Sequence, residues 1–140
     1  MSARCLAVVL LPLALTGCLG NDDSGGGPTS FIQDGNDANQ PFPANYRSEL
    51  VAFMHTYLNN PVGLHDAAVA EPVQRTVGGR PRYVACVRFA ERQSDGSYRE
   101  PWERAVVFVG GRLDRVAQNT GELCSGAAYA AFPDLEKMSR

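Results

Sequence analysis

The feature that most constrains the fold of this chain is a run of alternating side chains between Arg82 and Arg92. Aromatic and aliphatic residues recur at every second position, which is the pattern of a strand with one face in a core. A shorter run of the same kind covers Glu103–Val109, after a loop that begins at Ser94-Asp95-Gly96. Two such strands joined by a loop rather than by a helix predict an antiparallel sheet.

Two Gly-Gly pairs predict the tight turns that join these strands to their neighbours. Gly78-Gly79 connects the first run to a weaker strand over Ala67–Val77, in which Pro72 indicates a position at the edge of the sheet. Gly110-Gly111 connects the second run to a short strand from Arg112 to about Ala117. Together the runs predict an antiparallel β-meander of three to four strands.

A helix is predicted before the strands. Its apolar stripe repeats at the spacing of one helix face and consists of Tyr46, Leu50, Phe53, Met54, Tyr57 and Leu58. The helix ends at Asn59-Asn60-Pro61, because proline cannot continue the hydrogen-bond ladder. The predicted fold class is therefore α+β, with one N-terminal helix packed on the meander, in a single domain over residues 45–140.

Residues 18–44 differ in composition from this domain. Of the 26 residues from Leu19 to Ala44, 20 are Gly, Pro, Ser, Thr, Asn, Asp or Gln. Such a segment buries too little apolar surface to offset the entropy of ordering it. It is predicted to be a flexible tether with a coil span of roughly 30 Å. Four of its residues are Asp and none is basic, which favours an extended tether that stays away from an anionic bilayer.

Residues 1–17 have the layout of a secretory signal, with Arg4 followed by the apolar stretch Leu6–Leu15. The next residues complete the sequence Leu15-Thr16-Gly17-Cys18, which resembles the lipobox of bacterial lipoproteins. The resemblance implies cleavage before Cys18 and a diacylglyceryl group on its sulfur. In bacteria with an outer membrane it also implies a fatty acyl chain such as palmitate on the new amino terminus. The alternative is an ordinary secretory signal with an unrelated cysteine.

A lipid-modified Cys18 implies that the mature chain is held in the cell envelope. Each buried CH₂ of an acyl chain contributes about 0.8 kcal/mol, so two chains anchor stably where one does not. Leu19 follows the cysteine, at the position where lipoproteins retained in the enterobacterial inner membrane have aspartate. This resemblance favours the periplasmic face of the outer membrane over the inner membrane.

Cys86 and Cys124 are the two cysteines of the predicted domain. Because export places them in an oxidising compartment, we expect them to form a disulfide. A loop of this length contributes roughly 4 kcal/mol in the chain-entropy model. The alternatives are a zinc site with His55 and His65 or a redox thiol, but neither the cysteine spacing nor the histidine spacing has the corresponding signature.

Charge and motifs argue against several function classes. The formal net charge of -2 argues against a nucleic-acid-binding protein. The chain has no Gly-x-Ser-x-Gly motif, and neither Gly-Gly pair has the context of a phosphate-binding loop. His65 beside Asp66, in a predicted loop, is a weak candidate for catalysis. We expect a protein that is not an enzyme and that has neither catalytic residues nor a metal or cofactor.

Arg82 and Arg88 are candidate contact residues because they share one face of the strongest predicted strand with Arg80 and Arg92. If the helix covers the face of Phe89, these arginines stand on an open face that suits an anionic partner. The alternative is a solvated face on which the arginines pair with neighbouring glutamates.

Tyr98 and Trp102 form a second candidate contact, in the long loop between the two main strands. Exposed aromatic residues are frequent anchors of protein interfaces. The alternative for Trp102 is a lid that folds back on the core.

Four parts of the domain, Arg82–Arg88, Gly110–Asp114, Cys124 and Phe132–Glu136, resemble a group of small lipoproteins of alphaproteobacteria that has no assigned activity. Both domain cysteines match, so the resemblance also implies the disulfide. The order of helix and meander is similar in architecture to small outer-membrane assembly lipoproteins, and such a likeness carries little about function.

We therefore expect a membrane-anchored envelope lipoprotein that acts as a non-enzymatic interaction or assembly module, with an envelope protein as its partner. The alternative is a small-ligand-binding module or an enzyme inhibitor in the periplasm. Nothing in the sequence predicts an oligomeric state.

Overall fold

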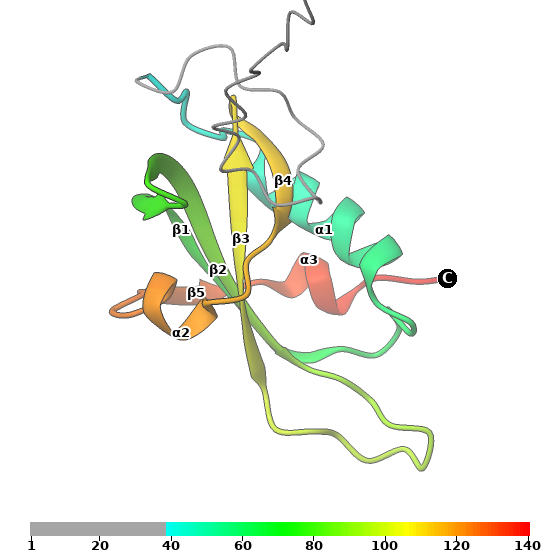
Figure 1. The fold of residues 1–140 in the computed structure, drawn as a ribbon. Coiled ribbons are helices and arrows are strands. Elements are labelled where there is room, and N and C mark those ends of the chain that lie inside the picture. The colour runs from blue at the N-terminus through cyan, green and yellow to red at the C-terminus, as the bar shows by residue number, and fades with distance from the viewer. Residues whose placement is uncertain (1–38) are drawn as a thin grey trace, which may run out of the picture.

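The computed structural model describes residues 39–140, so the predicted signal segment, Cys18 and most of the predicted tether lie outside the described residues. The described part contains one antiparallel sheet of five strands, in the order β4-β3-β2-β1-β5 (Figure 1). The strands are β1 (His65–Val77), β2 (Arg80–Ala90), β3 (Trp102–Val109), β4 (Arg112–Val116) and β5 (Tyr129–Ala131). The helices are α1 (Tyr46–Tyr57), α2 (Thr120–Leu123) and α3 (Pro133–Glu136).

The predicted antiparallel sheet and the disulfide are confirmed, but the sheet has five strands rather than three or four. Strands β1 to β4 are neighbours in chain order and coincide with the four predicted runs. The additional strand, β5, pairs with Ala68–Ala70 of β1. A strand of three residues is too short to show an alternating pattern, so this part of the sequence predicts only irregular chain.

Helix α1 packs on the face of the sheet that carries Val87 and Phe89. The side chains of Leu50 and Met54 are fully buried against these residues, as the helical spacing predicts. The C-terminal segment completes the same core with Phe132, Leu135 and Met138. Tyr57, the last residue of α1, belongs to the predicted apolar stripe but is 46% exposed.

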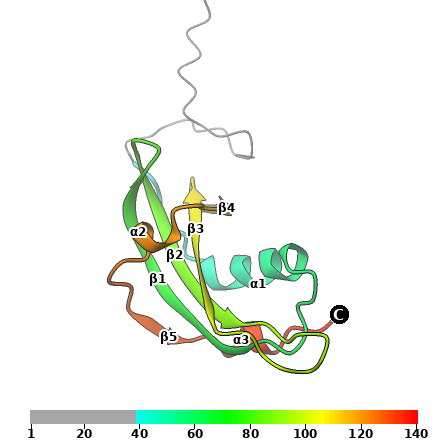
Figure 2. The same cartoon turned by 60° about the horizontal axis from the view of Figure 1, so that its bottom comes forward.

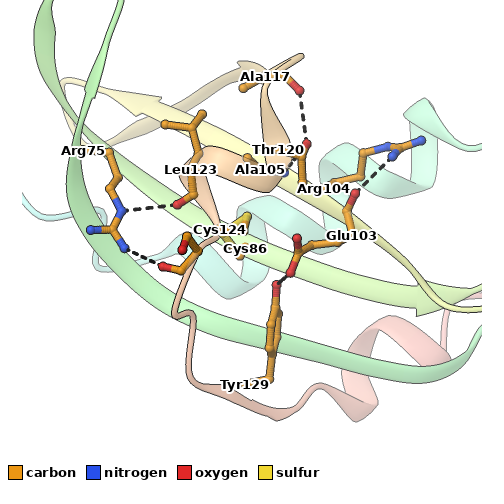
Figure 3. The surroundings of a disulfide bond; sticks show 11 residues. Arg75, Cys86, Glu103, Arg104, Ala105, Ala117, Thr120, Leu123, Cys124 and Tyr129 are labelled. Atoms are coloured by element: carbon orange, nitrogen blue, oxygen red, sulfur yellow. Dashed lines mark hydrogen bonds between the residues drawn. A yellow bond between two sulfur atoms is a disulfide. The ribbon is translucent and has the colours of Figure 1, made fainter.

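The middle of the opposite face is covered rather than open, which corrects the expectation of an exposed arginine face for Arg82, whereas Arg88 on the same face is exposed. Val84, Cys86 and Val107 pack there with Leu123 and Cys124 from the segment that includes α2. The disulfide joins Cys86 to Cys124 across this core, with a Cα–Cα distance of 5.7 Å (Figure 3). The cover forms because the disulfide and the apolar side chain of Leu123 hold this segment against the sheet.

Arg75 of β1 adds polar contacts to the covered face (Figure 3). Its Nε donates a hydrogen bond to the carbonyl of Leu123, and its Nη2 donates to the carbonyl of Ser125, both at 3.2 Å. Carbonyls at the end of a short helix lack partners within the helix, so the guanidinium satisfies groups that the helix itself leaves open.

Pro72 lies at an irregularity of β1, where the register against β2 shifts between Ala70 and Val73. The pairing with β5 ends at Ala70, so β1 from residue 71 onward pairs with β2 alone. This position suits proline, which cannot donate a ladder hydrogen bond and is found at edges and bulges. The prediction that β1 lies at the edge of the sheet is therefore wrong for Ala68–Ala70, which pair with β5, and holds only from residue 71 onward.

The sheet has two dissimilar ends, which we call the turn end and the loop end. The turn end consists of the turns at Gly78-Gly79 and Gly110-Gly111, and the loop end consists of the loop of residues 91–101 and the adjacent end of α1. Figures 1 and 2 both show the two turns at one end and the long loop at the other. Strand β2 connects the two ends and spans about 33 Å, from roughly 3.3 Å for each residue step.

The described chain enters the domain at the turn end. The side-chain Oε1 of Gln40 accepts a hydrogen bond from the backbone N–H of Gly110 at 2.7 Å. The ring of Phe42 packs edge-on against Tyr83, with 5.4 Å between ring centroids. Residues 40–43, which composition assigns to the tether, therefore pack on the domain, and the tether joins it beside the two turns.

Candidate functional site

The loop of residues 91–101 is held in place by its own backbone. Arg99 N–H donates to the Glu91 carbonyl at 3.1 Å, and Gln93 N–H donates to the Ser97 carbonyl at 2.8 Å. Gly96 N–H donates back to the Gln93 carbonyl at 3.0 Å, and the φ of +87° at Gly96 requires a glycine at the tip of the loop. The loop is thus a short hairpin that presents its side chains in a defined arrangement.

Asp95 closes the tip of this hairpin. Its Oδ1 accepts hydrogen bonds from Ser97 N–H at 2.9 Å and from Ser97 Oγ at 2.6 Å. These hydrogen bonds lower the pKa of the Asp95 carboxyl from its ordinary value, the bond from the Ser97 hydroxyl having the larger effect. The folded hairpin therefore stabilises the ionised carboxylate of Asp95.

Two exposed tyrosines lie at the loop end. Tyr98 is 41% exposed, and its ring packs at 4.4 Å from the ring of His65 on β1. Tyr57 is 46% exposed at the end of α1, where its ring stacks on Phe53 at 5.2 Å. Both tyrosines thus rest one face on a neighbouring ring and present the remainder to solvent, which is the form that aromatic anchors take at protein interfaces.

Two adjoining grooves run along this end of the domain, with volumes of about 580 and 620 Å³. They share Tyr57 and Arg104, so they form one depression that passes over these two side chains. The first part lies against the hairpin and includes Glu91, Arg99 and Trp102. The second part lies between α1 and the chain around β4.

Arg104 and Trp102 form the floor where the two grooves meet. The guanidinium carbon of Arg104 lies 3.0 Å from the centroid of the Trp102 ring, and the edge of that ring packs on buried Phe89 at 5.3 Å. Nη1 of Arg104 also donates to the carbonyl of Glu103 at 3.0 Å. Trp102 therefore acts partly as a lid on the core, and its stacked arginine presents a fixed positive charge in the groove.

The charges around the grooves are mixed. Basic and acidic side chains line them in equal number, namely Arg99, Arg104 and Arg115 with Glu91, Glu100 and Asp114. A surface of this composition does not select for a polyanion. Aromatic residues and arginine among mixed charges are instead the composition of protein–protein interfaces.

The structure separates the predicted contact residues. Tyr98 and Trp102 both lie at the loop end, whereas Arg82 lies next to the turn end and is only 5% exposed. Nη1 of Arg82 donates to the carbonyl of Pro81 at 2.8 Å. Arg88 lies on the opposite face of the sheet from Trp102, so the four residues do not form one surface.

Arg88 belongs to a small polar cluster that sequence analysis misses. Its guanidinium carbon lies 4.5 Å from the centroid of the Tyr129 ring, and the Tyr129 hydroxyl donates a hydrogen bond to Glu103 (Figure 3). Burial, and then the hydrogen bond to Glu103, raise the pKa of Tyr129 above its ordinary value of 10.0. Pairing of β5 with β1 places Tyr129 here, and no local signal reveals that pairing.

Both histidines lie at the loop end, where the exposed His65 packs its ring against Tyr98. Nε2 of His55 donates to the carbonyl of Ser139 at 2.9 Å, which ties the C-terminal segment to α1.

Among residues 39–140, no group of three or more His, Cys, Asp or Glu side chains is placed to hold a metal ion. Within the same residues, no helix has both the length and the apolar character needed to cross a membrane.

Comparison of the chain with protein family models, with curated proteins and with solved structures gives no significant match.

Proposed function

We propose that this domain is a non-enzymatic binding module of the cell envelope, anchored by lipid at Cys18, and that it engages an envelope protein through its loop end. The proposal depends on one observation. An ordered hairpin, two exposed tyrosines and a groove with Arg104 at its floor all occur at the loop end of the domain. A preformed surface of this kind binds with little loss of conformational entropy.

The position of the tether supports the same proposal. The chain enters the domain at the turn end, about 33 Å along β2 from the loop end. An anchor that leads to the turn end leaves the loop end free to face away from the membrane. The grooves there are accordingly accessible to a partner in the periplasm.

The proposal is tested by crosslinking the full-length lipidated protein in its native membrane and identifying the co-purified proteins by mass spectrometry. We expect one stoichiometric envelope protein, lost in Tyr98→Ala and retained in Val73→Ala. Val73 is the matched control because it is 45% exposed and lies on β1, away from the loop end. Capture that survives Tyr98→Ala in a folded protein would contradict the assignment of the surface.

A second candidate function is inhibition of an enzyme, and the order of the hairpin favours it. A loop fixed by its backbone hydrogen bonds, with Gly96 at its tip, has the form of an element that enters the cleft of a target. A protease or a lysozyme of the periplasm is the class of target to assay. Inhibition that is lost when the 91–101 loop is altered, without any stoichiometric envelope partner, would favour this candidate.

A further inference from the structure

The turn end carries the same four residues at both of its turns. Val-Gly-Gly-Arg occurs at 77–80 and again at 109–112. The central glycines have nearly the same conformations, with φ of 58° and 78° in the first turn and 58° and 77° in the second. A tight two-residue hairpin turn of type I′ requires positive φ at both of its central residues. Each turn therefore forms a compact tip of its hairpin, and an arginine follows it directly.

The two tips lie side by side at one end of the sheet. Tyr83 of β2 pairs with Phe108 of β3, so each hairpin turns within a few residues of this pair. Figures 1 and 2 show both tips projecting in the same direction as the start of the described chain. Arg80 and Arg112 consequently mark the end of the domain at which the tether is attached.

Charge and exposure at this end suit a negatively charged surface. The Arg112 side chain is 77% exposed, and the acidic residue that faces it, Glu49, lies 3.5 Å from its Nε and is largely covered. Glu49 also accepts the Leu113 N–H, so its carboxylate is engaged within the protein. An arginine that keeps most of its surface in solvent remains able to approach a second anion.

An apolar group accompanies the arginines. Phe42 is 43% exposed beside the two tips, with its ring against Tyr46 and Tyr83. Peripheral membrane association draws on this combination, since buried apolar area adds to electrostatic attraction for anionic lipids. Each arginine near an anionic bilayer raises the ratio of docked to undocked protein by about fivefold.

We infer that the turn end docks on the anionic phosphate headgroups of the membrane to which the protein is anchored, with Arg80, Arg112 and Phe42 as the contacts. The inference rests on the proposed lipid anchor, which keeps the domain at the surface and makes a weak contact effective. The aspartates of the tether oppose the attraction, so docking depends on the anchor. Docking orients the loop end toward the periplasm.

The test uses the full-length lipidated protein in vesicles of phosphatidylcholine, with and without phosphatidylglycerol. Trp102 is the single tryptophan of the chain, so Phe42→Trp combined with Trp102→Phe places one reporter at the turn end. We expect brominated lipids to quench this reporter in the anionic vesicles alone. High salt should abolish the quenching, because it screens exposed charges.

Matched variants identify the residues responsible. Arg80→Gln with Arg112→Gln should lower the docked-to-undocked ratio by about 25-fold, from the fivefold factor for each arginine. Arg80→Lys with Arg112→Lys should retain docking, and Arg92→Gln with Arg99→Gln, at the loop end, should leave it unchanged. Circular dichroism and an intact disulfide verify that each variant is folded.

Equal quenching in both kinds of vesicle, or quenching that survives loss of both arginines, would overturn the inference. Failure of the anchor has a different signature, since the protein would then not float with vesicles of either composition. If the anchor holds and docking fails, the protein floats with both kinds of vesicle while the reporter stays unquenched.

Discussion

At the residue scale, Tyr129 couples β5 to the rest of the sheet. Its hydroxyl donates to Glu103 and its ring supports the guanidinium of Arg88. The three side chains come from β5, β3 and β2, which follow separate parts of the sequence. The contact is thus a polar link between the C-terminal strand and the centre of the sheet.

We expect Tyr129→Phe to lower the free energy of unfolding by about 1 kcal/mol, the value of one hydrogen bond. The ring, and with it the contact to Arg88, is retained. Because the pKa of Tyr129 is raised in the folded state, its contribution to stability is complete below pH 10 and is lost as the pH rises above that value. Urea unfolding from neutral to strongly alkaline pH should show this decline in the wild type and a smaller one in Tyr129→Phe. Tyr98→Phe, at an exposed site, is the control.

Glu49 connects α1 to the edge of the sheet. One carboxylate oxygen accepts the backbone N–H of Leu113 at 2.6 Å, and the other lies 3.5 Å from Arg112. The ion pair contributes little because Arg112 is exposed, whereas the backbone N–H loses its partner when the carboxylate is removed.

We therefore expect Glu49→Ala to lower the free energy of unfolding by about 1–2 kcal/mol, measured by urea unfolding. Arg112→Ala should have a smaller effect, since it removes the ion pair alone. Glu71→Ala is the matched control at an exposed position of β1. An effect of Arg112→Ala as large as that of Glu49→Ala would contradict this assignment.

At the scale of elements, the strength of the sequence pattern decides what was predictable. Strand β2 has an apolar residue at every second position from Tyr83 to Phe89 and was predicted, as were β1, β3 and β4 with the two Gly-Gly turns. Helix α1 ends before Asn59-Asn60-Pro61, as predicted. The elements α2, α3 and β5 have only three or four residues each, so tertiary contacts rather than local pattern determine them.

The covered face of the sheet shows a second limit of sequence reasoning. The structure shows that α1 covers the face of Val87 and Phe89, a choice that alternation leaves open. Alternation places Arg82 and Arg88 on the other face. It carries no information on what covers that face, which depends on where the disulfide brings the chain around Cys124. The pairing of the cysteines was predictable, but its consequence for the arginines was not.

The disulfide is the main contact that holds the segment that includes α2 against the sheet. A single-turn helix is not stable alone, and its other contacts with the sheet include Leu123, the hydrogen bonds from Arg75 and a hydrogen bond from Ala105 N–H to Thr120 Oγ1. We expect Cys86→Ala with Cys124→Ala to lower the free energy of unfolding by about 2–4 kcal/mol. Hydrogen exchange should accelerate first in residues 117–131, and acceleration beginning instead in α1 would contradict this view.

At the scale of the whole molecule, the sheet separates two surfaces. The chain enters the domain at the turn end, which carries the two tips with their arginines, while the loop end carries the hairpin and the grooves. Sequence reasoning singled out Tyr98 and Trp102 as aromatic residues of one loop, whereas the structure makes Trp102 the first residue of β3. The same reasoning assigned Tyr57 to the buried stripe of the helix, since helical spacing does not reveal where the cover provided by the sheet ends.

The grooves themselves were beyond sequence reasoning. Their walls come from the end of α1, the loop of residues 91–101 and the chain after β4, which are distant in sequence and meet only in the folded domain. Arg104 is the clearest example. Its parity in β3 places it on the same face as Trp102, but this parity does not predict that the two side chains stack.

The central claim is that the loop end binds an envelope protein and that the turn end does not. Photo-crosslinking tests it most directly, with a photoreactive amino acid placed singly at Tyr57, Tyr98 or Val73 of the full-length lipidated protein in its native membrane. All three positions are more than 40% exposed, so their reactivity toward solvent is comparable. We predict one and the same protein adduct from Tyr57 and Tyr98 and none from Val73. Adducts of equal yield at all three positions, or adducts at Val73 alone, would contradict the account.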